Sequence, residues 1–594
     1  MKRVTLIPQT YTVLLVSLFC AWSSWSAAFA QQTAAPAAAQ LAKADPPIVT
    51  GKVEPAVVIS PPRNFQLPAR VGIVNEAPIA LTDALYMALA NNPEIQALRD
   101  DRDETAYKLR AAQGAYDPVF NVTGSFEKQI SPTGNTLSGG GADYSVLNRV
   151  WQASPSVSGA TPLYGGSYNV AFSNQRDYTN NAYATLNPSY PTTLSFEYKQ
   201  PLWRNLFYDS SRHAIEVSKK NIQVTNETFR QRVMAIIERT EQAYWELSFA
   251  RRDLGVQLQA LEVARAQDQT NRRQVNLGQL APIEVVAAQT QLATFEFNVY
   301  AAQEALTRAE NGLKSLILGD RSEALWASAL NPTTPPETEN SAPSLNDAIK
   351  DAIASRPEIA QMKLAVQVNQ ADQKLNREQL KPQVDLVASY ARTGLAGTAV
   401  SNTANPLADS LQPALVRLNQ LSALAGLDPV GLASFTPPPS QLVGGYGQSL
   451  GRLFGGDYPT TLVELRVSLP IMNRTAKANL GASLAEGRRL DHQMRAVEQT
   501  IEAEVRNALQ CIDSAQQRLA AARAKQESAE QEYQSEERRF GNGASTLFLV
   551  QQRQLNMVTS KSQVYRAEAD LNEAVSLLEL ARGENYSRHN IIIK

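Results

Sequence analysis

The chain has 594 residues and a formal net charge of −1 at pH 7, from 56 Lys and Arg against 57 Asp and Glu. No basic patch or run stands out, so the sequence gives no support to nucleic-acid binding. Of the two cysteines, Cys20 lies in a leader and only Cys511 follows it, so no disulfide within the mature chain can hold the fold together.

Residues 1–30 have the pattern of a secretory signal peptide. Two basic residues precede an apolar stretch at residues 11–22, and Ala28-Phe29-Ala30 suits cleavage before Gln31. The stretch is shorter than the roughly 20 residues that an uncleaved membrane anchor needs, and the bulky residue before Cys20 disfavours a lipid anchor. We therefore expect an exported protein. Beyond the leader no apolar run approaches the length of a membrane helix, which leaves a periplasmic protein, a secreted protein or a β-barrel.

After a Pro- and Ala-rich segment at residues 31–78, which we expect to be extended or disordered, the chain contains two copies of one unit. We place the first copy at residues 79–330, a linker at 331–343, the second copy at 344–583 and a tail at 584–594. The shared spacing argues against two unrelated helical stretches of similar composition. The matching segments are Leu81–Leu85 with Leu345–Ile349, Asn92–Ile95 with Arg356–Ile359, Tyr190–Leu194 with Tyr458–Leu462, Gly278 with Gly541, and Gln289–Leu292 with Gln552–Leu555.

Each copy is expected to contain two strands separated by a long polar loop. Apolar and polar residues alternate with a period of two, as in Phe120 and Val122 against Asn121 and Thr123, which predicts strands covered on one side only. Strands of about ten residues and loops rich in Gly, Ser, Asn and Pro suit a membrane barrel; a soluble antiparallel sheet is the alternative. The predicted strands are residues 118–128, 192–200, 383–392 and 461–469, and the loops are 129–190 and 394–458.

Four convincing strands per chain are fewer than the roughly eight that a small membrane barrel needs. An open sheet edge cannot face lipid, because its N–H and C=O groups would lack hydrogen-bond partners. The sequence therefore predicts that several chains share one barrel.

Two long helical hairpins follow the strands, at about residues 213–318 and 475–582. Mostly apolar residues recur in them every seven positions, as in a coiled coil, and about 60 helical residues span ~90 Å. Each hairpin reverses at a turn that contains glycine, which allows a positive φ. The recurring residues are Val233, Thr240, Leu247, Leu254 and Leu261 in the first copy, and Val505, Ile512 and Leu519 in the second.

In these features the chain resembles the TolC-like outer-membrane efflux factor family, over about residues 79–583. The order and duplication carry the resemblance, together with Gln200-Pro-Leu202, Leu469-Pro-Ile471 and Val275-Asn-Leu-Gly278 followed by Glu284 and Gln289. It implies an α+β membrane protein that forms a homotrimer. A shared transmembrane β-barrel of about twelve strands, four from each chain, would continue into a long periplasmic α-helical barrel.

The resemblance also implies a function. The chain would be the outer-membrane exit duct of a tripartite efflux or type I secretion system, embedded in outer-membrane lipid. It would meet a periplasmic adaptor protein and an inner-membrane pump of RND or ABC type. The rival interpretations are a periplasmic coiled-coil adaptor or scaffold protein, and a secreted structural or adhesive protein.

By the same resemblance, the two helical turns form the closed periplasmic mouth and dock the hairpins of the adaptor. In the alternative, their glycines act only as turn formers. The predicted docking residues are Asn276, Leu277, Gly278, Gln279 and Leu280 in the first turn, and Gly541, Asn542 and Gly543 in the second.

Two further expectations concern the mouth. Family members often carry aspartates on the second returning helix, and alignment at Gly541 puts Leu547 and Val550 at those positions, so we expect an apolar constriction instead of an acidic ring. Glu284 and Arg538, near the tips of opposite hairpins, could form an ion pair that holds the mouth shut. The alternative is two solvated charges.

The sequence contains no recognisable catalytic or metal-binding pattern. His213, His492 and His589 are far apart, and neither His-x-x-x-His nor Cys-x-x-Cys spacing occurs. No spacing supports a nucleophile paired with a base. We therefore expect no catalytic residue, no metal and no cofactor, and a protein that is not an enzyme.

Overall fold

A computed structural model describes residues 65–134, 139–140, 144–337, 343–400, 406–431 and 437–591. The chain divides into two units, Met1–Val58 and Ile59–Lys594, and every element below belongs to the second. The predicted signal peptide and most of the predicted segment at residues 31–78 lie outside the described residues.

One set of helices occurs twice along the chain. The first set is α1 (Leu81–Asn91), α2 (Pro93–Gln113), α3 (Ser210–Asn276) and α4 (Pro282–Ile317), and the second is α5 (Leu345–Ser355), α6 (Pro357–Glu378), α9 (Arg474–Gly541) and α10 (Leu547–Arg582). Side-chain caps fix the start of three helices. The side chain of Asn92 accepts a hydrogen bond from Glu94 N, that of Asp209 from Arg212 N and that of Ser344 from Asp347 N. Among the described residues, no helix combines the length and apolar character needed to cross a membrane.

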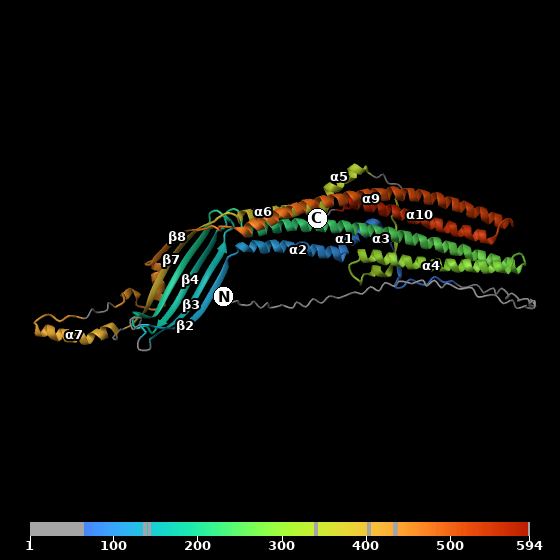
Figure 1. The fold of residues 1–594 in the computed structure, drawn as a ribbon. Coiled ribbons are helices and arrows are strands. Elements are labelled where there is room, and N and C mark those ends of the chain that lie inside the picture. Colours follow the sequence, from blue (N-terminus) through green and yellow to red (C-terminus); the bar gives the residue numbers. More distant parts are fainter. Residues whose placement is uncertain are drawn as a thin grey trace, which may run out of the picture. The chain divides into compact units, whose positions relative to one another are not determined.

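The long helices of the described part lie in a single layer that is four helices across (Figure 1). Near the sheet the order is α2, α3, α6, α9, and farther away it is α4, α3, α10, α9. One side of the layer is therefore formed by α2 and α4, and the other side by α9.

The predicted heptad positions form the core between these helices. Val233, Thr240, Leu247, Leu261, Val505, Ile512 and Leu519 are at most 3% exposed, and Leu254 is half-buried. Returning helices α4 and α10 bury matching residues 265 positions apart, so the duplication extends to packing. The matching pairs are Val285 with Val550, Val299 with Val564, Ala302 with Ala567, Leu306 with Leu571, and Leu313 with Leu578.

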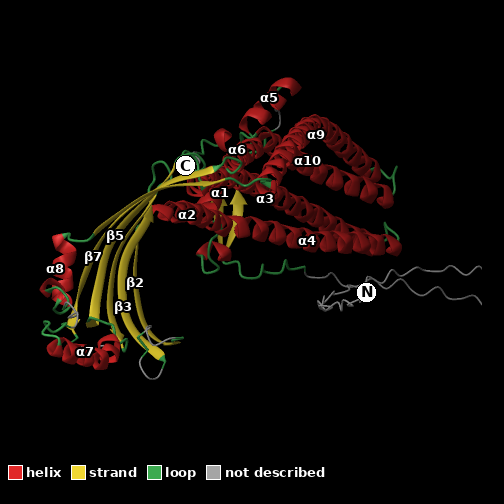
Figure 2. Ribbon diagram, turned by 60° about the vertical axis from the view of Figure 1, so that its left-hand side comes forward, coloured by secondary structure: helices red, strands yellow, loops and turns green. Residues whose placement is uncertain are grey.

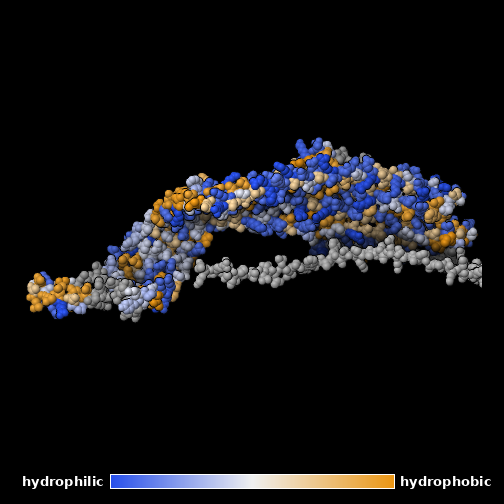
Figure 3. All heavy atoms as spheres, viewed as in Figure 1, coloured by the Kyte–Doolittle hydropathy of each residue, from blue (hydrophilic) through white to orange (hydrophobic). Residues whose placement is uncertain are grey.

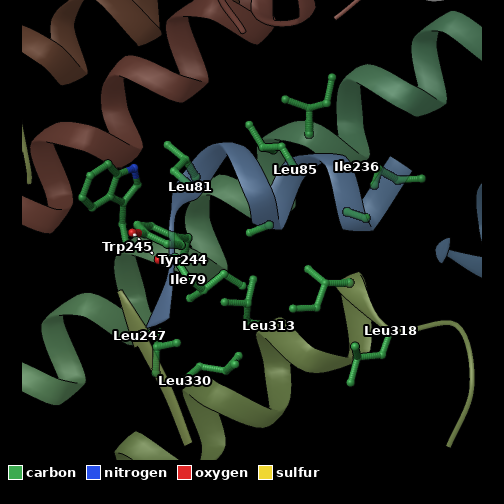
Figure 4. Close-up of a cluster of buried hydrophobic side chains, with 14 of the residues drawn as sticks. Ile79, Leu81, Leu85, Ile236, Tyr244, Trp245, Leu247, Leu313, Leu318 and Leu330 are labelled. Atoms are coloured by element: carbon green, nitrogen blue, oxygen red, sulfur yellow. Dashed lines mark hydrogen bonds between the residues drawn. The ribbon is translucent and has the colours of Figure 1, made fainter. Parts of the chain in front are cut away.

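An apolar cluster joins the first helical hairpin to the segments before and after it (Figure 4). Strand β1 (Asn75–Ile79) pairs in parallel with β6 (Ser328–Pro332), so parts of the predicted N-terminal segment and linker form a small sheet. The hydroxyl of Tyr244 on α3 donates to Ile79 O at 3.2 Å and accepts from Thr334 N at 2.9 Å. Side chains from α1, α3, α4 and β6 pack around it, including Leu85, Ile236, Leu247, Leu313 and Leu330.

Within the described residues, six strands form one antiparallel sheet, in the order β2-β3-β4-β5-β7-β8. The strands are β2 (Val119–Pro132), β3 (Ser145–Ala160), β4 (Ser167–Thr179), β5 (Leu186–Pro201), β7 (Gln383–Ala399) and β8 (Pro459–Ser468). The prediction of about four strands per chain is therefore wrong, because the segment predicted as a loop at residues 129–190 contains the hairpin β3–β4.

The other predicted loop, at residues 394–458, contains the end of β7 and two helices. These are α7 (Pro406–Leu424) and α8 (Tyr446–Gly455), which lie at the end of the sheet remote from the long helices (Figure 2). Helix α8 packs on β5 and β7, where the hydroxyls of Ser449 and Thr192 hydrogen-bond at 2.9 Å. The remaining short helices are η1 (Gly114–Tyr116), η4 (Ala324–Ala327), η5 (Ser440–Leu442) and α11 (Asn585–Arg588).

Charged side chains join the two copies where α10 packs on α3. Arg566 of α10 contacts Glu246 of α3 and also Asp570 at 2.7 Å and Glu573 at 3.5 Å. Burial raises the pKa of Glu573 to about 7, with Arg566 opposing the shift and the neighbouring carboxylates reinforcing it. This carboxyl group therefore binds a proton near neutral pH.

A second group of charged side chains, on α4, is buried within the described chain. Glu310 and Lys314, whose side chains are both 0% exposed, form an ion pair at 2.7 Å. Arg70 contacts the other carboxylate oxygen of Glu310 at 2.7 Å, and Lys314 Nζ donates to Trp326 O at 2.9 Å. The pair therefore ties α4 to the chain segments on both sides of the helical hairpin.

Glu310→Gln is expected to lower the free energy of unfolding by about 3–5 kcal/mol, because it leaves Lys314 buried without a counter-charge. Glu304→Gln on the same helix is the matched control, since its ion pair with Arg308 is 72% and 79% exposed and such pairs contribute about 0–1 kcal/mol. Urea unfolding of both variants, followed by circular dichroism, measures the difference. Equal losses in the two variants would contradict the importance of the buried pair.

Candidate functional site

The strand register sorts the side chains of the sheet onto two faces. On one face, here called the apolar face, apolar residues lie side by side across all six described strands. They include Phe120, Val122, Phe126, Trp151, Pro155, Val157, Tyr168, Val170, Phe172, Leu194, Phe196, Tyr198, Leu386, Ala388, Tyr390, Val463, Leu465 and Val467.

Much of the apolar face is exposed in the isolated chain. Phe120, Val463 and Val467 are 67%, 68% and 62% exposed, and Figure 3 shows apolar residues gathered over β8 and its junction with the helices. Monomeric soluble proteins rarely expose continuous apolar patches of this extent, which mark protein or membrane contacts. The face is therefore suited to contact with lipid.

The opposite, polar face carries every carboxylate of the six described strands. Its serines and glutamines form a local network, in which Gln152 Nε2 donates to Ser154 Oγ at 2.9 Å and Ser154 Oγ donates to Ser173 Oγ at 3.2 Å. Lys199 pairs with Asp385 at 3.0 Å on this face. Such a surface suits contact with water.

Aromatic residues follow the sheet where it passes into α3. Trp203 and Phe207 are 53% and 69% exposed. Tyr208 is instead buried, and its hydroxyl donates to Glu216 Oε2 at 2.8 Å. Two of these three aromatic side chains are thus available to an interface.

The long hairpins reverse at two turns, and both turns lie at the end of the helices remote from the sheet (Figures 1 and 2). In the first, Gly278 N donates to Val275 O and Gln279 N to Gln274 O, both at 2.9 Å. In the second, Gly543 N donates to Phe540 O and Ala544 N to Arg539 O, also at 2.9 Å. Both turns thus end their helix with the same glycine-capped motif.

This geometry corrects the alignment of the two turns. Gly278 and Gly543 have φ of 70° and 77°, whereas Gly541 is the last residue of α9. The structural equivalent of Gly278 is therefore Gly543, and the predicted match to Gly541 is wrong by two residues.

The structure leaves most predicted docking residues accessible. All except Leu280, which is half-buried, are exposed, and Leu277 is 72% exposed. The turns also have internal support that the sequence did not reveal: at the second turn, Glu536 accepts from Ser545 Oγ and pairs with Arg539 at 3.4 Å. Nothing in the residue spacing marks Glu536 apart from the neighbouring carboxylates of α9.

The residues predicted to form a constriction lie inside the second hairpin. Leu547 and Val550 are 1% and 5% exposed, so they pack within the chain and do not present an open surface. The exposed apolar side chains on this turn of α10 are Phe548 and Leu549, at 69% and 38%.

Glu284 and Arg538 do not pair within the described chain. Glu284 is half-buried at the start of α4, and Arg538 Nε donates to Gln534 O at 3.1 Å. Among the described residues, no group of three or more His, Cys, Asp or Glu side chains is arranged to hold a metal ion.

Comparisons with known proteins agree with this arrangement. The sequence profile of the family described as outer membrane efflux protein matches residues 84–319 and 348–584, which is most of the chain. No curated protein is similar enough in sequence to match.

Several solved structures share the fold. The CmeC outer membrane channel of Campylobacter jejuni has 14% identity and a TM-score of 0.55, covering 89% of this chain and 95% of its own. The outer membrane protein VceC of Vibrio cholerae has 13% identity and a TM-score of 0.55, covering 85% and 96%. The open-state MtrE outer membrane channel of Neisseria gonorrhoeae has 13% identity and a TM-score of 0.54, covering 85% and 89%.

Gly278→Ala and Gly543→Ala are each expected to lower the free energy of unfolding by about 1–2 kcal/mol, the cost of a left-handed backbone for an L-residue. No heavy atom lies within 4 Å of the added Cβ at either position, so backbone strain alone is responsible. Gly541→Ala, which also meets open space, is the control and should be neutral or stabilising, since alanine favours a helix by about 0.5–1 kcal/mol. Thermal unfolding distinguishes the turn alignments: a loss at Gly541 with none at Gly543 would restore the sequence-based one.

Proposed function

The chain belongs to the outer membrane efflux protein family, and on that premise we propose that it is the outer-membrane exit duct of a tripartite efflux or type I secretion system. In this role it conducts substrates passively to the exterior and catalyses no reaction. The observation that supports the proposal best is the six-stranded sheet, whose apolar face is continuous and whose strands lead directly into long helical hairpins.

The proposed duct is a homotrimer, because the sheet cannot close on itself. Strands β2 and β8 are its outer strands, and no other described strand covers them. In lipid, unpaired backbone groups at such edges cost several kcal/mol each, so β8 of one chain pairs with β2 of the next. This contact is heterologous, and heterologous contacts generate rings when the rotation closes.

Three six-stranded sheets give eighteen strands in place of the twelve implied by the family resemblance. Strands ~4.8 Å apart and tilted by ~40° would form a barrel about 36 Å across, against about 24 Å for twelve strands. Twelve helices about 10 Å apart, four from each chain, would form a tube about 38 Å across. The added hairpin β3–β4 thus lets the barrel match the width of the helical tube.

In this assembly the sheet lies in the outer membrane and the helices extend into the periplasm. The turns at Asn276–Leu280 and Gly541–Gly543 then dock a periplasmic adaptor, which links the duct to an inner-membrane pump of RND or ABC type. Exposure of all these residues except Leu280 supports that role. A coiled-coil adaptor or scaffold is not favoured, since it has no need of a sheet with one apolar face.

We also propose an apolar constriction at the periplasmic mouth, formed by residues other than Leu547 and Val550. Phe548 and Leu549 are the exposed apolar side chains at the level where the sequence suggests Leu547 and Val550. An ion pair between Glu284 and Arg538 would have to form between chains, because it is not formed within one.

Disulfide trapping tests the closure between chains. In a Cys511→Ser background, Thr123→Cys in β2 is combined in turn with cysteines at Thr460, Leu462 and Ser468 of β8, all on the polar face. Oxidation should link neighbouring chains in at least one combination and give covalent dimers and trimers on a denaturing gel.

Ser173→Cys in the interior strand β4 replaces Thr123→Cys in the control and should give no link to β8. A folded protein that forms no covalent species in any of the β2–β8 combinations would contradict the shared barrel.

A further inference from the structure

A row of basic residues crosses the apolar face near its end remote from the helices, with Ile130 and Leu147 beyond it on the same face. Lys128 of β2 lies directly opposite Arg149 of β3, and Arg176 of β4 lies opposite Trp151 of β3. All three cations share the apolar face and are exposed. We call Lys128, Arg149 and Arg176 the cation row.

The described chain supplies no counter-charge to the cation row. The carboxylates of the six described strands (Glu127, Asp177, Glu197, Asp385 and Glu464) all lie on the polar face by register. Within the described residues, none of the three cations forms an ion pair, and Arg149 instead lies 5.6 Å from the ring centre of Tyr178. By contrast, Lys199 and Arg466 on the polar face pair with Asp385 and Glu464 at 3.0 and 3.1 Å.

This arrangement is unfavourable without an external anion. Like charges directly opposite each other on neighbouring strands destabilise a sheet, and Lys128 and Arg149 form such a pair. A phosphate group that approached both would relieve the repulsion. Guanidinium groups bind phosphate through two parallel hydrogen bonds, and lysine binds it as a point charge.

The surroundings of the cation row indicate what carries the phosphate. Phe126 and Trp151 lie opposite each other, two positions closer to the helices than Lys128 and Arg149, and their ring centres are 4.4 Å apart. The apolar face continues from them towards the helices. A ligand that covers both surfaces needs an anionic head and apolar chains. Long basic side chains at such a boundary can extend their charges towards the head while their stems cover apolar surface.

Helix α8 borders the cation row on the β5 side. The hydroxyl of Tyr446 on α8 donates to Asn174 Oδ1 at 2.6 Å, and Asn174 is two residues before Arg176 on the same face. Phe454 of α8 is 68% exposed. This exposed aromatic side chain at the same end of the sheet is also suited to a membrane interface.

We propose that Lys128, Arg149 and Arg176 bind the anionic phosphate headgroup of a lipid whose acyl chains cover the adjoining apolar face. The inference rests on the proposed function, since it requires the sheet to lie in a membrane. It adds a lipid-headgroup site at the outer boundary of the barrel, formed by strands that include the added hairpin β3–β4.

The test compares the purified assembly with a variant carrying Lys128→Gln, Arg149→Gln and Arg176→Gln. Diphosphorylated lipid A and phosphatidylcholine are titrated separately in mixed micelles, and native mass spectrometry measures the lipid retained. Each cation near an anionic lipid surface contributes about a fivefold factor, so the loss of three should weaken lipid A binding about a hundredfold at low salt. Its binding of phosphatidylcholine should not change.

Two further variants serve as controls. Lys108→Gln, Arg308→Gln and Arg506→Gln together remove the same charge from exposed positions on α2, α4 and α9, and should leave lipid A binding at the wild-type level. Arg149→Lys with Arg176→Lys keeps the charge and should retain most of the affinity, which shows that the site depends on charge and not on a disturbed sheet.

The possible outcomes separate this inference from the proposed function. Equal lipid A binding by the wild type and the triple Gln variant, with both still assembled as trimers, would overturn the site and leave the duct intact. Displacement of lipid A by inorganic phosphate at equal phosphate concentration would also overturn it, in favour of a free-anion site. Failure of the wild type to assemble or to insert into phosphatidylcholine bilayers would overturn both proposals.

Discussion

The structure depends on the two open edges of a single curved sheet. Among the described strands, β2 and β8 each have backbone N–H and C=O groups on one side without a strand partner. Water can satisfy such groups, but lipid cannot, and each unsatisfied group in lipid costs several kcal/mol. One face of this sheet is apolar across all its strands, which suits lipid. In the proposed duct the sheet lies in lipid, where each of its open edges needs a strand from a neighbouring chain.

The layer of long helices, like the sheet, has two open sides. They form one layer in the described part, with α2 and α4 on one side and α9 on the other. These sides follow the sheet: α2 leads into β2, and β8 leads into α9. A neighbouring chain that completes the sheet would therefore complete the helical layer with the same rotation. Duplication helps here, because matched burial in α4 and α10 gives both hairpins the same packing surface.

The amino-acid sequence predicts the elements whose pattern is strong and local. The heptad residues from Val233 to Leu261 are mostly buried, and the four strands with clear alternation are present. The sequence does not predict the hairpin β3–β4, because Pro155 breaks the strand pattern at residues 145–160 and because Asn, Gln and Ser give β4 the composition of a loop. Only the pairing with β2 and β5 shows that these segments complete the apolar face.

The two helical turns show a different limit of prediction from sequence. Gly541 and Gly543 are two residues apart, and the sequence alone could not identify which one adopts positive φ. An alignment on Gly541 is shifted by two positions and points to Leu547 and Val550 as pore residues, although both side chains are buried within the hairpin. The direction in which a helical side chain points depends on the residue at which the helix starts, so a small error in the turn changes which residues face outwards.

Electron cryomicroscopy of the purified protein in lipid nanodiscs tests the central claim most directly. The account predicts a ring of three chains whose wall contains eighteen continuous strands, with β8 of each chain hydrogen-bonded to β2 of the next. A lone chain with both sheet edges facing lipid, or a barrel that closes without contact between β2 and β8, would contradict it.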